Sequence, residues 1–145
     1  MKLTTRSRYG TRMLIDIARN GVEGPVRISD IAQRQKVSVK YLEKLIRELR
    51  LAGFIRSRRG PKGGHMLNRP ASEIHIGDVV KVLEGDGALV DCASDKPNCD
   101  RAPDCATRAV WREASLAVYQ ALNTYTVQDL LAGGDTGCVP TNPVA

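Results

Sequence analysis

Residues 28–68 read ISDIAQRQKVSVKYLEKLIRELRLAGFIRSRRGPKGGHMLN, a run that predicts two helices followed by two strands. The first helix is expected over Ser29–Gln35, with Ser29 as its N-cap, and the second over Val39–Ala52, capped by Ser38. The second helix carries an apolar stripe at positions i, i+3, i+4 and i+7, formed by Leu42, Leu45, Ile46 and Leu49. Two helices joined by so short a turn predict a helix-turn-helix unit.

The end of the same stretch predicts a β-hairpin. Residues 54–58 and 65–68 are strand-like, and the glycine-rich turn RGPKGG at residues 59–64 joins them. A hairpin placed directly after the second helix of a helix-turn-helix is a wing. Its glycines allow close approach to a DNA backbone, and Arg59 can enter a narrow minor groove.

The remaining chain predicts a mainly α-helical protein. Apolar spacing indicates helices over residues 9–19, over residues 76–83, and from about Cys105 to Asn123, and Thr126 can cap a short last helix. We expect a winged helix-turn-helix domain at residues 1–86, a segment that we call the cysteine loop at residues 87–105, a helical segment at residues 106–131, and a flexible tail at residues 132–145.

Charge is segregated along the sequence. Residues 1–70 hold 17 Lys and Arg against 5 Asp and Glu, a net charge of +12, whereas residues 71–145 carry −6. Such segregation predicts a part that binds a polyanion, joined to a part with another task. The alternative is a small helical domain whose charged residues merely solvate its surface. The adjoining basic wing favours binding to double-stranded DNA.

The predicted second helix has the outer face that a recognition helix needs. Its polar residues within positions 38–47 are Ser38, Lys40, Tyr41, Glu43, Lys44 and Arg47. Lysine and arginine side chains reach phosphates or guanine edges, and a glutamate accepts a hydrogen bond from cytosine N4. Pro61 and Lys62 lie at the tip of the wing beside Arg59.

Three cysteines lie in the cysteine loop, at Cys92, Cys99 and Cys105. Thiolates this close in sequence serve an iron–sulfur cluster, another metal, a disulfide or a redox switch. The spacing Cys-x6-Cys-x5-Cys is wider than the pairs of zinc sites, and wide loops suit the larger cluster. A thiol switch and zinc stay open as alternatives, and Cys138 is expected to be an inert or exposed thiol.

Several function classes find no support in the sequence. There is no signal-peptide pattern, and no window approaches the ~20 apolar residues of a membrane span, so a cytoplasmic protein without membrane association is expected. Stable disulfides are uncommon there. No catalytic triad spacing, P-loop or dinucleotide fingerprint is present, so the chain is not expected to be an enzyme.

The chain resembles the IscR/NsrR/RirA regulators, bacterial winged-helix repressors of the "Rrf-two" family. The resemblance runs from about residue 1 to residue 131. Its most specific parts are the Arg-Gly-Pro-x-Gly-Gly wing and the cysteine triplet, and it also rests on Arg8-Tyr9-Gly10, Gly24-Pro25-Val26, Ile28-Ser29-Asp30-Ile31-Ala32, Ser38-Val39-Lys40-Tyr41-Leu42-Glu43, Ile76-Gly77-Asp78-Val79 and Trp111-Arg112.

The resemblance implies a homodimer in which the helix after Cys105 crosses its partner and two recognition helices read a pseudo-palindromic operator. It also implies that Thr4, Arg8 and Tyr9 contact phosphates and that the three cysteines hold a 2Fe–2S or 4Fe–4S cluster. The resulting expectation is a repressor that senses iron–sulfur status, redox state or nitric oxide. A metal-free thiol switch or a partner-sensing repressor is the alternative.

The fourth cluster ligand is where the sequence departs from the family. Members that regulate cluster assembly have a histidine three positions after the third cysteine, and this chain has Arg108 there. The nitric-oxide sensors have a carboxylate near the start of the first helix, and Ser7-Arg8-Tyr9 offers none. The candidates are a small exogenous ligand and the side chains of Asp104, His75, Asp91 and Cys138. Trp111, early in the long helix, is expected to anchor the cysteine loop.

Overall fold

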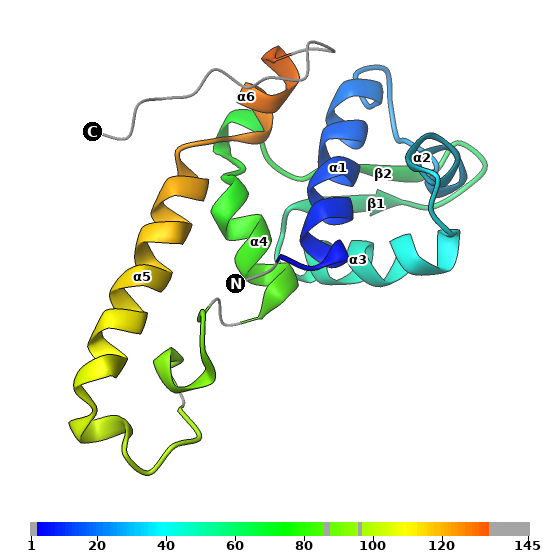
Figure 1. Cartoon of the computed structure of the whole chain (residues 1–145). Coiled ribbons are helices and arrows are strands. Elements are labelled where there is room, and N and C mark those ends of the chain that lie inside the picture. Colours follow the sequence, from blue (N-terminus) through cyan, green and yellow to red (C-terminus); the bar gives the residue numbers. More distant parts are fainter. Residues whose placement is uncertain (1–2, 86–87, 96, 134–145) are drawn as a thin grey trace.

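The computed structural model describes residues 3–85, 88–95 and 97–133 (Figure 1). The first part holds α1 (Thr5–Asn20), α2 (Ile28–Gln35), α3 (Val39–Leu51), β1 (Ile55–Arg58) and β2 (Gly64–Leu67). The second part is helical and holds η1 (Ala71–Glu73), α4 (Ile76–Glu84), η2 (Asp91–Ala93), η3 (Ala102–Asp104), α5 (Ala106–Asn123) and α6 (Val127–Ala132). The predicted class, mainly helical with a two-stranded wing and a long C-terminal helix, is confirmed. The tail from residue 134, with Cys138, lies outside the described residues.

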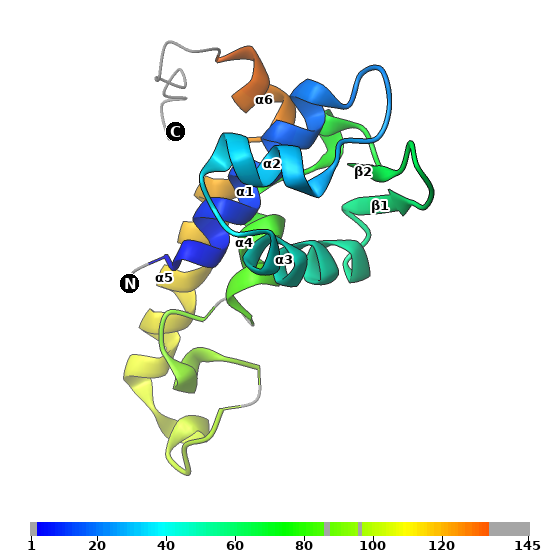
Figure 2. The same cartoon turned by 90° about the vertical axis from the view of Figure 1, so that its right-hand side faces the viewer.

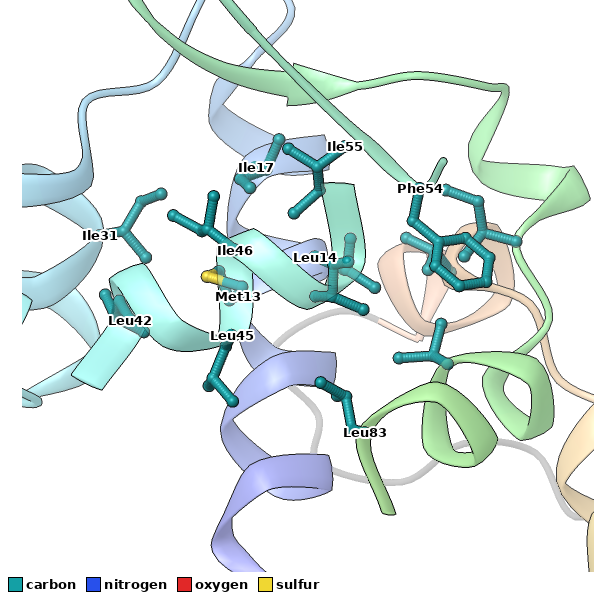
Figure 3. Close-up of a cluster of buried hydrophobic side chains, with 14 of the residues drawn as sticks. Met13, Leu14, Ile17, Ile31, Leu42, Leu45, Ile46, Phe54, Ile55 and Leu83 are labelled. Carbon is teal, nitrogen blue, oxygen red and sulfur yellow. The ribbon is translucent and has the colours of Figure 1, made fainter. Parts of the chain in front are cut away.

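The core forms where α1, α3 and α4 meet. The apolar stripe predicted for α3 is fully or almost fully buried, and it packs with Met13, Leu14 and Ile17 of α1 (Figure 3). Leu83 of α4 is also fully buried, and a Cβ atom added at Gly10 would lie 2.2 Å from its Cδ1. A side chain at position 10 would therefore require the Leu83 side chain to shift.

The wing is a short antiparallel ladder that is tied back to the helical core. Ile55 pairs with Leu67 at its base and Arg58 with Gly64 at its tip. His65 also exchanges two backbone hydrogen bonds with Val26, of 2.8 and 2.9 Å, which fixes β2 to the segment between α1 and α2. A Cβ atom at Gly64 would lie 2.5 Å from the Val26 carbonyl oxygen, so this close approach requires glycine.

Two helix starts differ from the sequence prediction. Ser29 was wrongly predicted as the N-cap of α2, because the helix begins at Ile28 and the Ser29 hydroxyl donates to Asp30 instead. The first helix begins four residues earlier than predicted, since the Thr4 hydroxyl accepts from the Arg6 N–H and caps it. Ser38 caps α3 as predicted, and the capping box of Thr126 with Asp129 is also present.

Helix α5 touches the core through Tyr119 and Leu122 but is largely exposed over the rest of its length. Its one buried residue among those described is Ser115, whereas Val110, Trp111 and Leu116 are 57, 43 and 61% exposed. In Figures 1 and 2 the cysteine loop lies at the lower end of α5, away from the hairpin, which extends from the side that carries α2 and α3. The wing and the cysteine loop therefore lie on different sides of the molecule, far from each other.

Candidate DNA interface and cysteine loop

The outer face of α3 is open to solvent and mostly basic. Lys40, Glu43, Lys44 and Arg47 are all exposed, and none of their four side chains makes a hydrogen bond or ion pair with another described residue. The buried stripe on the opposite face fixes the rotation of the helix, so these side chains must point outward. The structure thus places four of the predicted DNA-reading residues on one accessible surface.

Tyr41 has a different environment from its neighbours on α3. It is half-buried, its hydroxyl donates to Thr5 Oγ1 at 3.1 Å, and its ring meets Tyr9 edge-on with centroids 6.0 Å apart. The guanidinium of Arg8 lies 5.9 Å from the centroid of the Tyr9 ring and that of Arg12 lies 5.3 Å from it. Tyr41 and Tyr9 therefore join α1 to α3 and present a basic edge beside the recognition face.

The first turn of α1 is held by residues distant in sequence. Arg6 forms an ion pair with Glu48 of α3. Thr4, which we predicted as a phosphate contact, donates from its backbone N–H and its hydroxyl to Glu84 Oε1 at 2.9 and 2.8 Å. Its donor groups are therefore directed to a carboxylate in this structure. The role of Glu84 carries no sequence motif and was missed by the sequence analysis.

The wing tip is basic and accessible. Arg59, Pro61 and Lys62, the predicted DNA contacts of the wing, are all exposed. The Pro61 carbonyl accepts from Arg27 Nη2 at 2.9 Å, a contact that holds the tip and that sequence reasoning did not find. His65 has a structural role in β2, because Nδ1 pairs with Ser57 Oγ at 2.9 Å. Burial, aided by the charge of Arg50, lowers the pKa of His65 below its ordinary value.

An ion pair whose carboxylate is buried and whose arginine is partly exposed joins α1 to α2. The Asp16 side chain is 4% exposed and receives Arg34 Nη2 at 2.6 Å and Gln35 Nε2 at 2.9 Å. Burial alone would raise the pKa of Asp16, but the hydrogen bonds from Arg34 and Gln35 outweigh it and lower that pKa. The carboxylate is therefore ionised and holds the first helix of the helix-turn-helix in place.

The three cysteines occupy different positions in the cysteine loop. Cys92 lies in η2, Cys99 is exposed, and Cys105 is the N-cap residue of α5, and all three are free thiols. The Cys105 thiol contacts Thr107 Oγ1 at 3.2 Å, and this hydrogen bond, followed by one from the Arg108 N–H, lowers the pKa of Cys105. The loop thus supplies thiolate donors of the kind that an iron–sulfur cluster requires.

The three cysteine thiols are present in the loop but do not converge on one point. Within residues 3–85, 88–95 and 97–133, no three His, Cys, Asp or Glu side chains converge into a group that could hold a metal ion. The chemistry of the cysteines fits a cluster, whereas its binding would require the loop to draw them together. His75, one of the candidate fourth ligands, lies far from the loop of its own chain, because its Nδ1 pairs with the Asn123 carbonyl at the far end of α5, ~27 Å along that helix from Cys105.

Arg108 has a defined role in the loop. Its Nε donates to the Cys92 carbonyl at 2.7 Å, and its two terminal nitrogens donate to the carbonyls of Ser94 and Ala102 at 3.3 and 3.4 Å. The residue that stands in place of the family histidine therefore joins both arms of the cysteine loop to α5. A residue with five fixed donors suits this role.

Trp111 is partly open to solvent, and the anchoring role predicted for it stays a prediction. Its side chain is 43% exposed, and its carbonyl accepts from the buried Ser115 hydroxyl. Ser115 itself anchors the loop, because its Oγ accepts from the Leu89 N–H at 3.0 Å. Among the described residues, no helix has both the length and the apolar character needed to cross a membrane.

A winged helix-turn-helix with an exposed basic recognition face defines a DNA-binding regulator. The chain belongs to the Rrf2 family, described as iron-dependent transcriptional regulators, whose model matches residues 3–133. This confirms the predicted family and places the chain among regulators rather than enzymes.

Individual relatives agree with this family. The protein rrf2 of Nitratidesulfovibrio vulgaris is 56% identical over 142 residues, which cover 98% of this chain and 93% of that protein. Two solved structures each give a TM-score of 0.74. CymR, the global cysteine regulator of B. subtilis, is 34% identical, and the match covers 93% of this chain and 99% of the CymR chain. IscR of T. potens is 32% identical, and the match covers 98% of this chain and 94% of the IscR chain.

Proposed function

We propose that this chain is a dimeric, cytoplasmic repressor that binds a pseudo-palindromic operator and holds an iron–sulfur cluster through Cys92, Cys99 and Cys105. The observation that carries the proposal is the arrangement of three free thiols on one loop directly before α5, joined to a winged helix with an exposed basic face. In this proposal, residues 1–86 bind DNA, residues 87–105 sense, and residues 106–131 dimerise.

The DNA contacts follow from exposure and charge. Lys40, Glu43 and Lys44 lie on the early turns of α3 that would enter the major groove, and Arg47 lies one turn further along. Arg59, Pro61 and Lys62 would meet the backbone or the minor groove. Arg8 and Thr4 lie at the start of α1, where a phosphate would approach, and Ser38 lies at the start of α3.

The exposed apolar residues of α5 support the dimer. Trp111 and Leu116 are large, apolar and open to solvent on a helix that buries little within its own chain. Burial of such side chains in an interface contributes about 25 cal/mol per Å² of apolar surface. A second copy of α5 would cover them and would place two recognition helices on half-sites that lie ~34 Å apart or a multiple of that.

The cysteine loop would hold the cluster through its thiolates, which must be deprotonated to bind iron. A bound cluster, 2Fe–2S or 4Fe–4S, would supply one-electron redox chemistry and reactivity toward oxidants or nitric oxide. Arg108 cannot ligate iron because it has no free lone pair, so the fourth ligand falls to Asp91, Asp104, Cys138 or an exogenous group. The side chains of Asp91 and Asp104 are exposed and lie in the loop itself.

Anaerobic purification tests the cluster directly. Wild-type protein is expected to be coloured after reconstitution with iron and sulfide, and Cys92→Ser, Cys99→Ser and Cys105→Ser are each expected to lose the colour. Mössbauer spectra would then fix the cluster type. A colourless wild type would refute the cluster, while gel-shift binding to DNA would separately test the regulator.

A metal-free thiol switch is the second candidate function, supported by the lowered pKa and free state of Cys105. A thiol with more thiolate at neutral pH reacts faster with oxidants. Mass spectrometry of the oxidised protein would distinguish the two candidates. A bridge between two of the three cysteines that reverses on reduction, together with colourless reconstituted protein, would favour the switch.

The dimer has its own test. Leu116→Glu places a charge on the exposed face of α5 and is expected to convert the dimer into a monomer in light scattering. Val22→Glu is the matched control, because Val22 is 85% exposed and lies between α1 and α2. Wild-type protein that is monomeric at micromolar concentration would contradict the proposed assembly.

A further inference from the structure

The carboxylate of Glu84 joins two segments that are far apart in sequence. One of its oxygens, Oε1, accepts from the Thr4 N–H and the Thr4 hydroxyl, 80 residues away, and from the Ser7 hydroxyl, 77 residues away. Ser7 is buried at 2% exposure, so this is an interior contact as well as a cap at the helix start. Figure 1 shows the start of α1 beside the last turn of α4.

The charge of Glu84 is maintained by these contacts. Burial opposes its ionisation, but the hydrogen bonds from Ser7 and Thr4 outweigh burial and lower the pKa of Glu84 below its ordinary value. The carboxylate therefore stays ionised near neutral pH and accepts bonds from three donors at once.

The same turn of α1 also contacts the recognition helix. Thr5 Oγ1 accepts from the Tyr41 hydroxyl, and Arg6 pairs with Glu48, both on α3. Within residues 4–7, α4 thus holds the outer two, Thr4 and Ser7, and α3 holds the middle two, Thr5 and Arg6. A displacement of the last turn of α4 must change the first turn of α1 or break these bonds.

Glu84 is also close in sequence to the cysteine loop. Helix α4 ends at Glu84, and Cys92 follows eight residues later. The neighbouring Leu83 is fully buried against Gly10, where a Cβ atom would lie 2.2 Å from Leu83 Cδ1, so α4 and α1 pack closely at this point. Because close-packed interiors transmit strain, a shift at the end of α4 is expected to shift the start of α1 as well.

We propose that Glu84 is the positioning residue that couples the state of the cysteine loop to the DNA-binding elements, through the first turn of α1 and from there to α3. The coupling rests on the proposed DNA-binding function but does not require the cluster, since any event that moves the loop acts through the same contact. Coupling between two sites is reciprocal, so DNA binding must also change the cysteine loop.

Thiol alkylation in metal-free, reduced protein tests this reciprocity. The rate of iodoacetamide reaction at Cys92 is measured by mass spectrometry, with and without a duplex selected from a random-sequence library by binding to the wild type. Wild-type protein is expected to show at least a ~5-fold difference between the two rates, the lower end of usual coupling. Glu84→Ala is expected to reduce the ratio to near 1.

Glu84→Gln is the conservative variant, because its amide oxygen can still accept at the position of Oε1 while the charge is lost. It is expected to restore part of the ratio, which a purely structural role would not predict. Ser7→Ala gives a second route to the same contact if Glu84→Ala folds poorly. Glu23→Ala, at an exposed site between α1 and α2, is the control and is expected to keep the wild-type ratio.

The outcomes separate the two proposals. A wild type that binds no DNA would remove the regulator function, and this inference with it. A wild type that binds DNA but shows equal alkylation rates would overturn the coupling alone. An unchanged ratio in folded Glu84→Ala would overturn the role of Glu84.

Discussion

Replacement of Arg108 by alanine tests whether this residue organises the cysteine loop. The substitution removes one short hydrogen bond, Nε to the Cys92 carbonyl at 2.7 Å, and two long ones, to Ser94 and Ala102 at 3.3 and 3.4 Å. A hydrogen bond from a charged donor contributes about 1.5–3 kcal/mol, and we assign the two long ones ~0.5 kcal/mol each. The local stabilisation lost is therefore about 2.5–4 kcal/mol.

This loss should appear as local opening rather than global unfolding. The carbonyls of Cys92, Ser94 and Ala102 belong to the loop, and their residues lie outside the main hydrophobic cluster. Since 1.4 kcal/mol corresponds to a factor of ten, opening of the loop becomes ~60-fold to ~700-fold more frequent. Amides in the turns of the loop, such as Ala93 and Ala102, should exchange faster by up to that factor.

Hydrogen–deuterium exchange with mass spectrometry measures this effect in peptides that cover residues 88–105. Arg112→Ala is the matched control, one turn further along α5, because the Arg112 side chain makes no hydrogen bond or ion pair with another described residue. It is expected to leave the exchange of the loop unchanged. An acceleration below ~3-fold in Arg108→Ala, less than 1 kcal/mol, would refute the assigned role.

Three further predictions concern the DNA-binding part. Asp16→Asn is expected to lower the free energy of unfolding by about 1–3 kcal/mol in urea titrations at pH 7, since Arg34 loses its charged partner. Because the pKa of Asp16 is lowered in the folded state, this difference should shrink as pH falls below ~4. Glu43→Ala should relax base preference in selection experiments, whereas equal losses on specific and random DNA would contradict its role. Lys44→Ala should reduce the slope of log K against log salt by ~0.9 if it contacts one phosphate.

The winged helix was predictable because each of its elements follows from local chemistry. The stripe from Leu42 to Leu49 has helical period, Ser38 has the usual capping side chain, and the glycine-rich turn at residues 59–64 closes a hairpin. Ser29 has the same capping chemistry as Ser38 but pairs with Asp30, its neighbour in sequence. The residue type alone therefore does not reveal whether a serine hydroxyl bonds a backbone N–H of the helix or a neighbouring side chain.

The long-range contacts of Glu84 and of the cysteine loop were not predictable in the same way. Glu84 meets Thr4 across 80 residues, and Arg108 meets the Cys92 carbonyl across 16. Such pairs depend on how helices pack, and hydrogen bonds to backbone carbonyls leave no pattern of residue types. The cysteines revealed where the loop lies and what donors it has, whereas the structure shows what holds it.

The way in which the loop is attached explains how a sensor can change without unfolding the part that reads DNA. Every buried residue of the main hydrophobic cluster that the structure describes lies before residue 84 or at Val127, so the loop adds nothing to that core. Arg108 and Ser115 of α5 attach the loop through hydrogen bonds, and Ala93 and Ala102 are its buried apolar residues among those described. Polar contacts of this kind contribute a few kcal/mol in total, which lies within the binding free energy of a metal centre. The binding free energy of a ligand can therefore offset the loss of the contacts that hold the loop, whereas it cannot offset the loss of the hydrophobic core.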